Sequence, residues 1–185
     1  FHGDAELDYF GYAVSGAGDV DNDGTPDVII GGYGFGDNVG VAKVYSGADG
    51  TLLHTFTGDD ADDVFGKAVA GVGDINGDGF DDVIVGAHGA DNGTGNSNIG
   101  SAKVFSGQDG SVIYTLTGDQ VGEQFGYSVS GAGDVDGDGT GDLLVGSYLY
   151  EISNGNDAGG AYIYSGSDGE LLATYVGDSN NYFGF

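Results

Sequence analysis

Three acidic loops of nine residues recur in the chain with the same spacing of oxygen-bearing side chains. Each has Asp or Asn at loop positions 1, 3, 5 and 9 and Gly at position 6. A hard cation such as Ca²⁺ takes about six to eight oxygen ligands, and alternate residues of a tight loop can aim their carboxylates at one point. Gly at position 6 permits the sharp bend that brings the backbone carbonyl of position 7 to that point. The predicted side-chain ligands are Asp19, Asp21, Asp23 and Asp27, then Asp74, Asn76, Asp78 and Asp82, and finally Asp134, Asp136, Asp138 and Asp142.

Two other interpretations of these loops are weaker. A helix–loop–helix calcium hand needs a bidentate Glu at loop position 12. That position here is Ile30, Val85 or Val145, each inside an apolar run. An acidic turn held by backbone hydrogen bonds alone would leave several carboxylates crowded together without a cation, which their repulsion disfavours. We therefore predict calcium as a cofactor, with three sites, one in each repeat, and a structural role.

The elements that position these loops belong to a longer repeat. Phe-Gly pairs mark its successive copies, at intervals of about 55 to 60 residues. After each pair come a short strand with small residues, the acidic loop, an apolar run, a variable Gly/Asn-rich loop, a second strand, a Ser-Gly-X-Asp-Gly turn and a last strand. The pairs are Phe10-Gly11, Phe65-Gly66, Phe125-Gly126 and Phe183-Gly184.

Each repeat therefore predicts four short β-strands. Their residues are β-branched, aromatic or Leu, and Gly, Asp and Asn turns separate them. No window has a sustained apolar period of 3.6 residues, so we expect no helix of consequence. The strands predicted most clearly are 28–30, 41–45 and 52–57 in the first repeat, 83–85, 102–105 and 112–117 in the second, and 143–145, 161–164 and 171–176 in the third.

Four-stranded units of this period predict an all-β fold of β-propeller blades. We expect a single array over 1–185, with repeats at about 1–55, 56–115 and 116–174, while 175–185 begins a fourth. Three blades are fewer than the roughly four to eight that close a ring. We expect an incomplete ring, whose outer faces are covered by further repeats of a longer chain or by other copies of this one.

The repeated pattern of Phe-Gly pair, acidic loop and apolar run resembles that of a known family. Phe-Gly, followed by Gly-Asp, an Asp-X-Asp-Gly-X-X-Asp loop and an apolar run, resembles the FG-GAP repeat of integrin alpha-subunit propellers and their bacterial relatives. The resemblance covers nearly the whole chain and recurs three times in register. It implies a β-propeller with calcium in the turn between the first two strands of each blade. It also implies that the residues at loop position 7, Thr25, Phe80 and Thr140, ligate through their backbone carbonyls.

Composition narrows the choice of partners and compartment. The formal net charge is −27, and Lys43, Lys67 and Lys103 are the only Lys or Arg residues. Such a surface repels nucleic acid and anionic lipid. No apolar stretch approaches the ~20 residues of a membrane span. The chain has no cysteine and so no disulfides, and we expect bound calcium to provide the stabilisation that disulfides would otherwise give. We expect an extracellular or cell-surface location.

Recognition is expected on the three variable loops, residues 33–40, 88–100 and 148–160, because binding residues concentrate on loops held by a rigid scaffold. Asn92-Gly-Thr94 matches the glycosylation acceptor pattern. We see no nucleophile motif and no histidine cluster, and we predict no catalytic residue and no enzymatic activity.

The expected function is a calcium-stabilised extracellular structural or adhesive module, which stacks with further repeats or subunits into a larger propeller or filament. Its partners would be those repeats, homo-oligomer neighbours, and a protein or glycan ligand. One alternative is a carbohydrate-binding, lectin-like module that uses Tyr33 and Tyr148 in the variable loops. The other is a segment of a secreted hydrolase or lyase.

Overall fold

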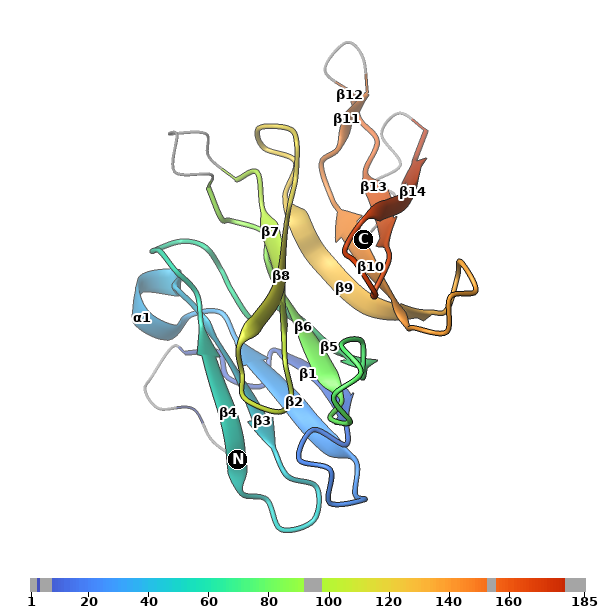
Figure 1. Ribbon diagram of the computed structural model, residues 1–185. Coiled ribbons are helices and arrows are strands. Elements are labelled where there is room, and N and C mark those ends of the chain that lie inside the picture. Colours follow the sequence, from blue (N-terminus) through green and yellow to red (C-terminus); the bar gives the residue numbers. More distant parts are fainter. Residues whose placement is uncertain (1–2, 4–7, 92–97, 153–155, 179–185) are drawn as a thin grey trace.

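The computed structural model describes residues 3, 8–91, 98–152 and 156–178. These residues form an all-β structure of three four-stranded antiparallel sheets, as the sequence predicts. The sheets lie side by side without closing into a ring (Figure 1). The predicted acceptor Asn92 and the fourth pair, Phe183-Gly184, lie outside the described residues.

Each sheet places its first strand at one edge and its last strand at the other. The first strands of successive sheets are neighbours, so β5 lies between β1 and β9. The strands of the first sheet are β1 (Ala13–Gly18), β2 (Asp27–Gly32), β3 (Val41–Tyr45) and β4 (Leu52–Thr57). Those of the second are β5 (Ala68–Gly73), β6 (Asp82–Ala87), β7 (Ser101–Phe105) and β8 (Val112–Thr117). Those of the third are β9 (Phe125–Gly133), β10 (Asp142–Ser147), β13 (Gly160–Tyr164) and β14 (Leu171–Val176).

Two small elements that the sequence did not predict occupy variable loops. A four-residue helix, α1 (Phe35–Asn38), follows β2, and its Gly36 and Asp37 have left-handed backbone angles. A two-stranded hairpin of β11 (Glu151–Ile152) and β12 (Asn156–Asp157) stands between β10 and β13. The variable loops therefore differ in local structure as well as in length, while the sheets that carry them repeat.

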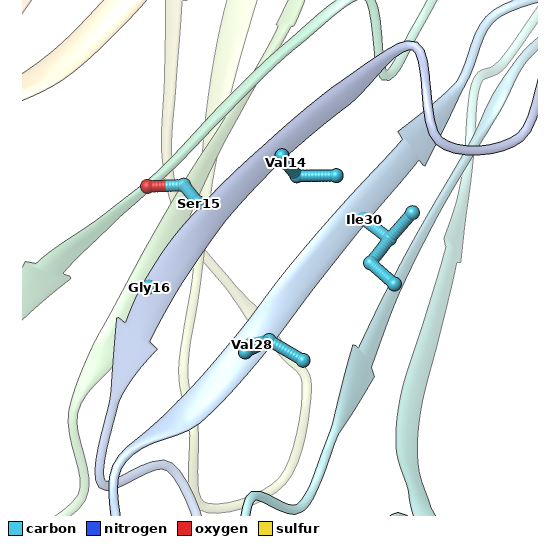
Figure 2. Close-up of a pocket in the computed structure, with 5 residues that line it drawn as sticks. All are labelled: Val14, Ser15, Gly16, Val28 and Ile30. Carbon is cyan, nitrogen blue, oxygen red and sulfur yellow. The ribbon is translucent and has the colours of Figure 1, made fainter. Parts of the chain in front are cut away.

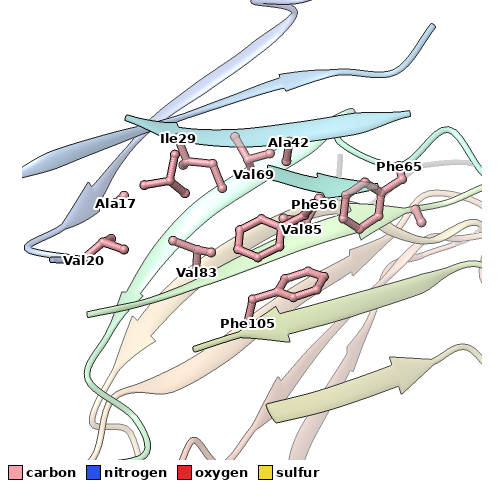
Figure 3. Packing of buried hydrophobic residues seen from close by; sticks show 12 residues of the cluster. Ala17, Val20, Ile29, Ala42, Phe56, Phe65, Val69, Val83, Val85 and Phe105 are labelled. Atoms are coloured by element: carbon pink, nitrogen blue, oxygen red, sulfur yellow. The ribbon is translucent and has the colours of Figure 1, made fainter. Parts of the chain in front are cut away.

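Two apolar layers join the three sheets. The first, between sheets one and two, packs Ile29 and Val44 against Val83 and Val85, and the ring of Phe56 stacks on Phe105 at 4.1 Å (Figure 3). The second layer joins sheets two and three, where Ile84, Val104 and Leu116 meet Leu143 and Val145. The middle sheet is therefore apolar on both faces, and its β6 is buried along its whole length.

The Phe-Gly pairs stand at these two junctions. Phe65 and Phe125 are both fully buried, one in each apolar layer. Gly66 has φ +83°, and a Cβ there would meet the carbonyl oxygen of Val41 at 2.2 Å. Glycine is required because the backbone turns through a left-handed conformation against a strand of the preceding sheet.

Candidate metal centres

Each predicted metal loop connects the first and second strands of a sheet. We name residues 19–27, 74–82 and 134–142 acidic loops 1, 2 and 3. They join β1 to β2, β5 to β6 and β9 to β10. The glycines at position 6, Gly24, Gly79 and Gly139, have φ of +90°, +93° and +95°. The same left-handed bend therefore recurs at the position where the sequence requires it.

Carboxylate-to-backbone hydrogen bonds fix the path of each loop. The position-1 side chain accepts from the N–H of the position-6 glycine at 2.9 Å in loops 1 and 2 and at 3.0 Å in loop 3. The position-3 side chain accepts from the position-5 N–H at 2.9 to 3.1 Å. The position-5 side chain accepts from the position-7 N–H at 2.7 to 2.9 Å. The three side chains thus turn inward toward the loop's own backbone.

The position-9 aspartates have a second role that the sequence did not indicate. Asp27, Asp82 and Asp142 are buried, and both oxygens of each carboxylate accept a backbone hydrogen bond. One bond comes from loop position 2, and the other from the glycine of the Ser-Gly turn between the third and fourth strands. For Asp82 the donors are the N–H groups of Ile75 and Gly107, both at 3.0 Å. Each position-9 aspartate therefore fastens its loop to another part of the same sheet.

Burial and crowding affect the charge of these carboxyls. Burial raises the pKa of Asp82 to about 6, although two backbone hydrogen bonds act in the opposite direction. Desolvation raises the pKa of Asp21, and the charges of Asp27, Asp23 and Asp19 add to that increase. A bound cation would counter both effects, since a nearby positive charge favours the ionised carboxylate.

The oxygens that a cation would need come together in two of the loops. Carboxylate oxygens of Asp19, Asp21 and Asp27 lie within 4.8 Å of one another, as do those of Asp134, Asp136 and Asp138. An ion with ligands at about 2.3–2.6 Å can contact oxygens up to about 5 Å apart. Loop 2 has the neutral amide of Asn76 at position 3. The donors are all oxygens, and each carboxylate oxygen that accepts one hydrogen bond keeps a further lone pair. This donor set fits calcium, and the individual ligands stay predictions.

An acidic residue two places before each Phe-Gly pair was missed by the sequence analysis. Glu123 is fully buried. One carboxylate oxygen accepts from the N–H groups of Asp119 and Gln120, and the other accepts from the Tyr162 hydroxyl at 2.5 Å. Asp63 is its counterpart and caps the equivalent loop through the N–H groups of Asp59 and Asp60. The recurrence of Asp8, Asp63 and Glu123 was the signal that could have revealed the role.

Aromatic rings meet where the first strands begin. Tyr33 stacks on Tyr9 at 4.9 Å, and Tyr148 stacks on Tyr127 at 4.9 Å. The Lys67 ammonium lies over both Tyr33 and Tyr127, at 5.9 and 4.8 Å from the ring centroids. We name Tyr9, Tyr12, Tyr33, Lys67, His88, Tyr127 and Tyr148 the aromatic row. It brings together Tyr33 and Tyr148, which the sequence analysis singled out, and adds partners that it did not foresee.

The sequence is similar to a known repeat family and to known proteins that carry it. The model of the FG-GAP repeat matches residues 65–105 and 125–164. The chain thus contains two FG-GAP repeats, one in each of these ranges. Integrin alpha-V of Gallus gallus is 31% identical over 164 residues, which cover 85% of this chain and 15% of the relative. Integrin alpha-7 of Homo sapiens is 36% identical over 150 residues, covering 75% of this chain and 12% of the relative. The chain thus spans only about 12–15% of the length of these relatives.

Solved structures agree on the fold. A rhamnogalacturonan lyase PL11 of Bacillus licheniformis superposes with a TM-score of 0.57 at 16% identity, covering 91% of this chain and 35% of the lyase. The rhamnogalacturonan lyase YesW superposes with a TM-score of 0.53 at 20% identity and the same coverage. At these identities the likeness shows the propeller fold alone. Within the described residues, the structure has no helix with the length and apolar character to cross a membrane.

Proposed function

We propose that the chain is a calcium-stabilised extracellular structural or adhesive module, whose blades stack with further FG-GAP repeats or subunits. The observation that carries the proposal is an equivalence between the free faces and the buried faces of the sheets. The free face of the first sheet has a hollow of about 450 Å³ lined by Val14, Val28 and Ile30, of which Val14 is exposed and Ile30 is buried in the floor of the sheet (Figure 2). By repeat position these residues correspond to Val69, Val83 and Val85, which pack against the first sheet.

The third sheet presents the complementary face. Tyr175 of β14 corresponds to Phe56 of β4 and Leu116 of β8, which both pack against the sheet that follows them. Tyr175 is 53% exposed, whereas Phe56 and Leu116 are 6% and 7% exposed. Val14 is 69% exposed, whereas Val69 is 8% exposed. One end thus presents the surface that the other end is shaped to receive, which is a head-to-tail arrangement.

The metal role rests on the donor set and on charge. Three loops present carboxylate oxygens beside buried aspartates in a chain of net charge −27. A ligand that binds only the folded state at 100 times its Kd stabilises that state by about 2.7 kcal/mol per site. Calcium at three sites would therefore supply much of a typical domain's stability of about 5–15 kcal/mol. The integrin relatives favour an extracellular or cell-surface location, where calcium is abundant.

The stacking proposal is tested by the molar mass of the chain in excess CaCl₂, measured by light scattering after size exclusion. A discrete multiple of 18.5 kDa, or a growing polymer, is expected if second copies fill the free faces. Val14→Asp should then restore the monomer, while Val121→Asp should not, because Val121 is similarly exposed at 64% but lies in a loop. A concentrated sample that stays at 18.5 kDa would contradict stacking with second copies and leave further repeats as the neighbours.

The calcium proposal needs its own measurement. Isothermal titration with CaCl₂ should give three binding events per chain, and removing calcium with EDTA should lower the melting temperature. A chain that neither binds calcium nor melts earlier in EDTA would contradict the metal role. Lanthanum or terbium can serve as a second probe of the same oxygen sites.

A second candidate function is carbohydrate binding on the aromatic row. It is favoured by the exposure of Tyr9 and Tyr12, which are 51% and 58% exposed beside Tyr33. Aromatic faces stack on the apolar faces of sugars. Saturable binding on a glycan array that is lost in Tyr33→Ala or Tyr148→Ala, but kept in Tyr175→Ala, would support it. We propose no catalytic activity, and turnover of a polysaccharide by the purified chain would contradict that view.

A further inference from the structure

A residue of acidic loop 2 forms two hydrogen bonds with acidic loop 1 across the first junction between sheets. The side-chain oxygen Oδ2 of Asp81 accepts from the Asp19 N–H at 2.8 Å. The Asp81 N–H donates to the Asp19 carbonyl oxygen at 3.1 Å. Asp19 is position 1 of loop 1, and both peptide groups that flank its α-carbon are therefore fixed by a single residue 62 positions further along the chain.

The contact between Asp81 and loop 1 is close. Among the described residues it occurs at the first junction between sheets and has no counterpart at the second. A Cβ at Gly18 would lie 2.1 Å from Oδ2 of Asp81, so the carboxylate rests against the backbone where loop 1 begins. Gly73 is the counterpart of Gly18 at the start of loop 2, and a Cβ there would meet nothing within 4 Å. The counterpart of Asp81 in loop 3 is Gly141, which has no side chain. Asp81 therefore links loops 1 and 2, and within the part of the chain that the structure describes no equivalent side chain links loops 2 and 3.

We propose that Asp81 couples cation binding in loops 1 and 2, while loop 3 binds independently. This inference rests on the proposed calcium role. Asp81 lies between Phe80 and Asp82, two predicted ligands of loop 2, and it contacts Asp19, the first predicted ligand of loop 1. An ion that orders loop 2 also orders Asp81 and so fixes the position of Asp19. Because coupling between sites is reciprocal, an ion in loop 1 favours binding in loop 2 by the same factor.

Amide signals can report each loop separately. The N–H groups of Gly24, Gly79 and Gly139 each donate to the position-1 aspartate of their own loop. We would titrate the 185-residue chain with CaCl₂ and follow these three signals by ¹H–¹⁵N NMR. Asp78→Ala disables loop 2 at position 5. We expect the calcium midpoint at Gly24 to rise at least about fivefold, the lower end of typical coupling, while the midpoint at Gly139 changes less than about twofold.

Two variants of Asp81 identify the route. In an Asp81→Gly background, Asp78→Ala should no longer move the Gly24 midpoint. Asp81→Asn keeps an oxygen acceptor for the Asp19 N–H and removes the charge, so coupling should persist. Equal loss of coupling in Asp81→Gly and Asp81→Asn would mean that charge carries the effect, and it would overturn the hydrogen-bonded link. An unchanged Gly139 signal before calcium addition verifies that each variant is folded.

The failure of this inference and the failure of the metal role are distinguishable. If Gly24 and Gly139 respond to calcium but Asp78→Ala leaves the Gly24 midpoint unchanged, the coupling is wrong and the calcium role stands. If Asp78→Ala raises both midpoints equally, the variant has acted on the whole molecule and the specific link is wrong. If none of the three glycine signals responds to calcium, both proposals are wrong.

Discussion

The two junctions between sheets have the same backbone plan and different side-chain chemistry. At the first junction, Lys103 pairs with the carboxylate of Asp59 at 2.5 Å, and the Lys103 and Asp59 side chains are 15% and 67% exposed. Tyr162 occupies the same repeat position at the second junction, where it donates a hydrogen bond to the fully buried Glu123. One junction thus places its polar pair at the solvent boundary and the other places it in the core.

The two polar pairs are expected to contribute differently to the stability of their junctions. Exposed ion pairs contribute about 0–1 kcal/mol because water screens them. A buried carboxylate is favourable only while its hydrogen-bond partners are complete, and losing a partner is costly. The first junction instead has the Asp81 link and the Phe56–Phe105 stack. We expect the second junction to be sensitive to single polar substitutions and the first to tolerate them.

The largest expected effect is at Glu123. Glu123→Ala leaves the Tyr162 hydroxyl and the N–H groups of Asp119 and Gln120 without their acceptor, and should reduce the free energy of unfolding by about 3–5 kcal/mol. Asp63→Ala removes two backbone bonds and should reduce it by about 1–3 kcal/mol. Urea unfolding of both variants in excess CaCl₂ measures the difference. Equal losses would show that the two junctions do not differ in this way.

Tyr162→Phe tests the buried hydrogen bond alone. The substitution keeps the ring that packs against Phe125 and removes the hydroxyl that donates to Glu123. Because hydrogen bonds to charged groups contribute about 1.5–3 kcal/mol, the free energy of unfolding should fall by that amount. Tyr164→Phe on the same strand is the control, because the Tyr164 ring also packs against Phe125, while the hydroxyl that donates to Glu123 is that of Tyr162. A similar loss in both variants would argue against a special role for the Glu123 pair.

His88 should make the second junction sensitive to acid. Burial, and secondarily the charge of Lys67, lowers the pKa of His88 from 6.5 to about 4. Its Nδ1 is buried and has no hydrogen-bond partner among the residues that the structure describes, and its ring meets the edge of Tyr127 at 5.0 Å. Between pH 6.5 and pH 4, His88 is protonated in the unfolded chain and neutral in the folded chain. The free energy of unfolding therefore falls as the pH drops toward 4. Between pH 7 and pH 5 this loss should be about 2 kcal/mol.

The matched variant for this pH effect is His88→Tyr, because Tyr33 and Tyr148 stand at the equivalent positions of the other repeats. It removes the titrating group and keeps an aromatic ring. The difference in unfolding free energy between pH 7 and pH 5 should shrink by about 2 kcal/mol relative to the unsubstituted chain. An identical pH slope in both proteins would show that His88 does not control it.

The smallest expected effect is at the first junction's ion pair. A double-mutant cycle of Lys103→Gln and Asp59→Asn should give a coupling energy of about 0–1 kcal/mol at low salt. Raising the ionic strength to about 1 M should remove most of it, because the Debye length shortens to about 3 Å. A coupling above about 2 kcal/mol that persists in salt would mean that this pair behaves like a buried one.

Much of the fold followed from local pattern. The strands 41–45, 52–57, 112–117 and 171–176 are found with the predicted bounds, because alternating β-branched and aromatic residues between Gly/Asp turns favour strands wherever they occur. The acidic loops also follow from spacing, since a carboxylate two to five residues before an N–H can reach it within a single turn. The left-handed bend at Gly24 and its counterparts also follows from the loop sequence, because glycine stands at position 6 in all three loops.

The tertiary structure alone decided which of these local units depend on one another. Asp81 and Asp19 are 62 residues apart, and Tyr162 and Glu123 are 39 apart. No periodicity joins such residues, because the distance between them depends on how successive sheets pack. The position-9 aspartates are an intermediate case: their place in the loop was evident, but their bonds to the Ser-Gly turn arise only when the third and fourth strands fold back. Sequence determined the blades and their acidic loops, and packing determined the links between blades.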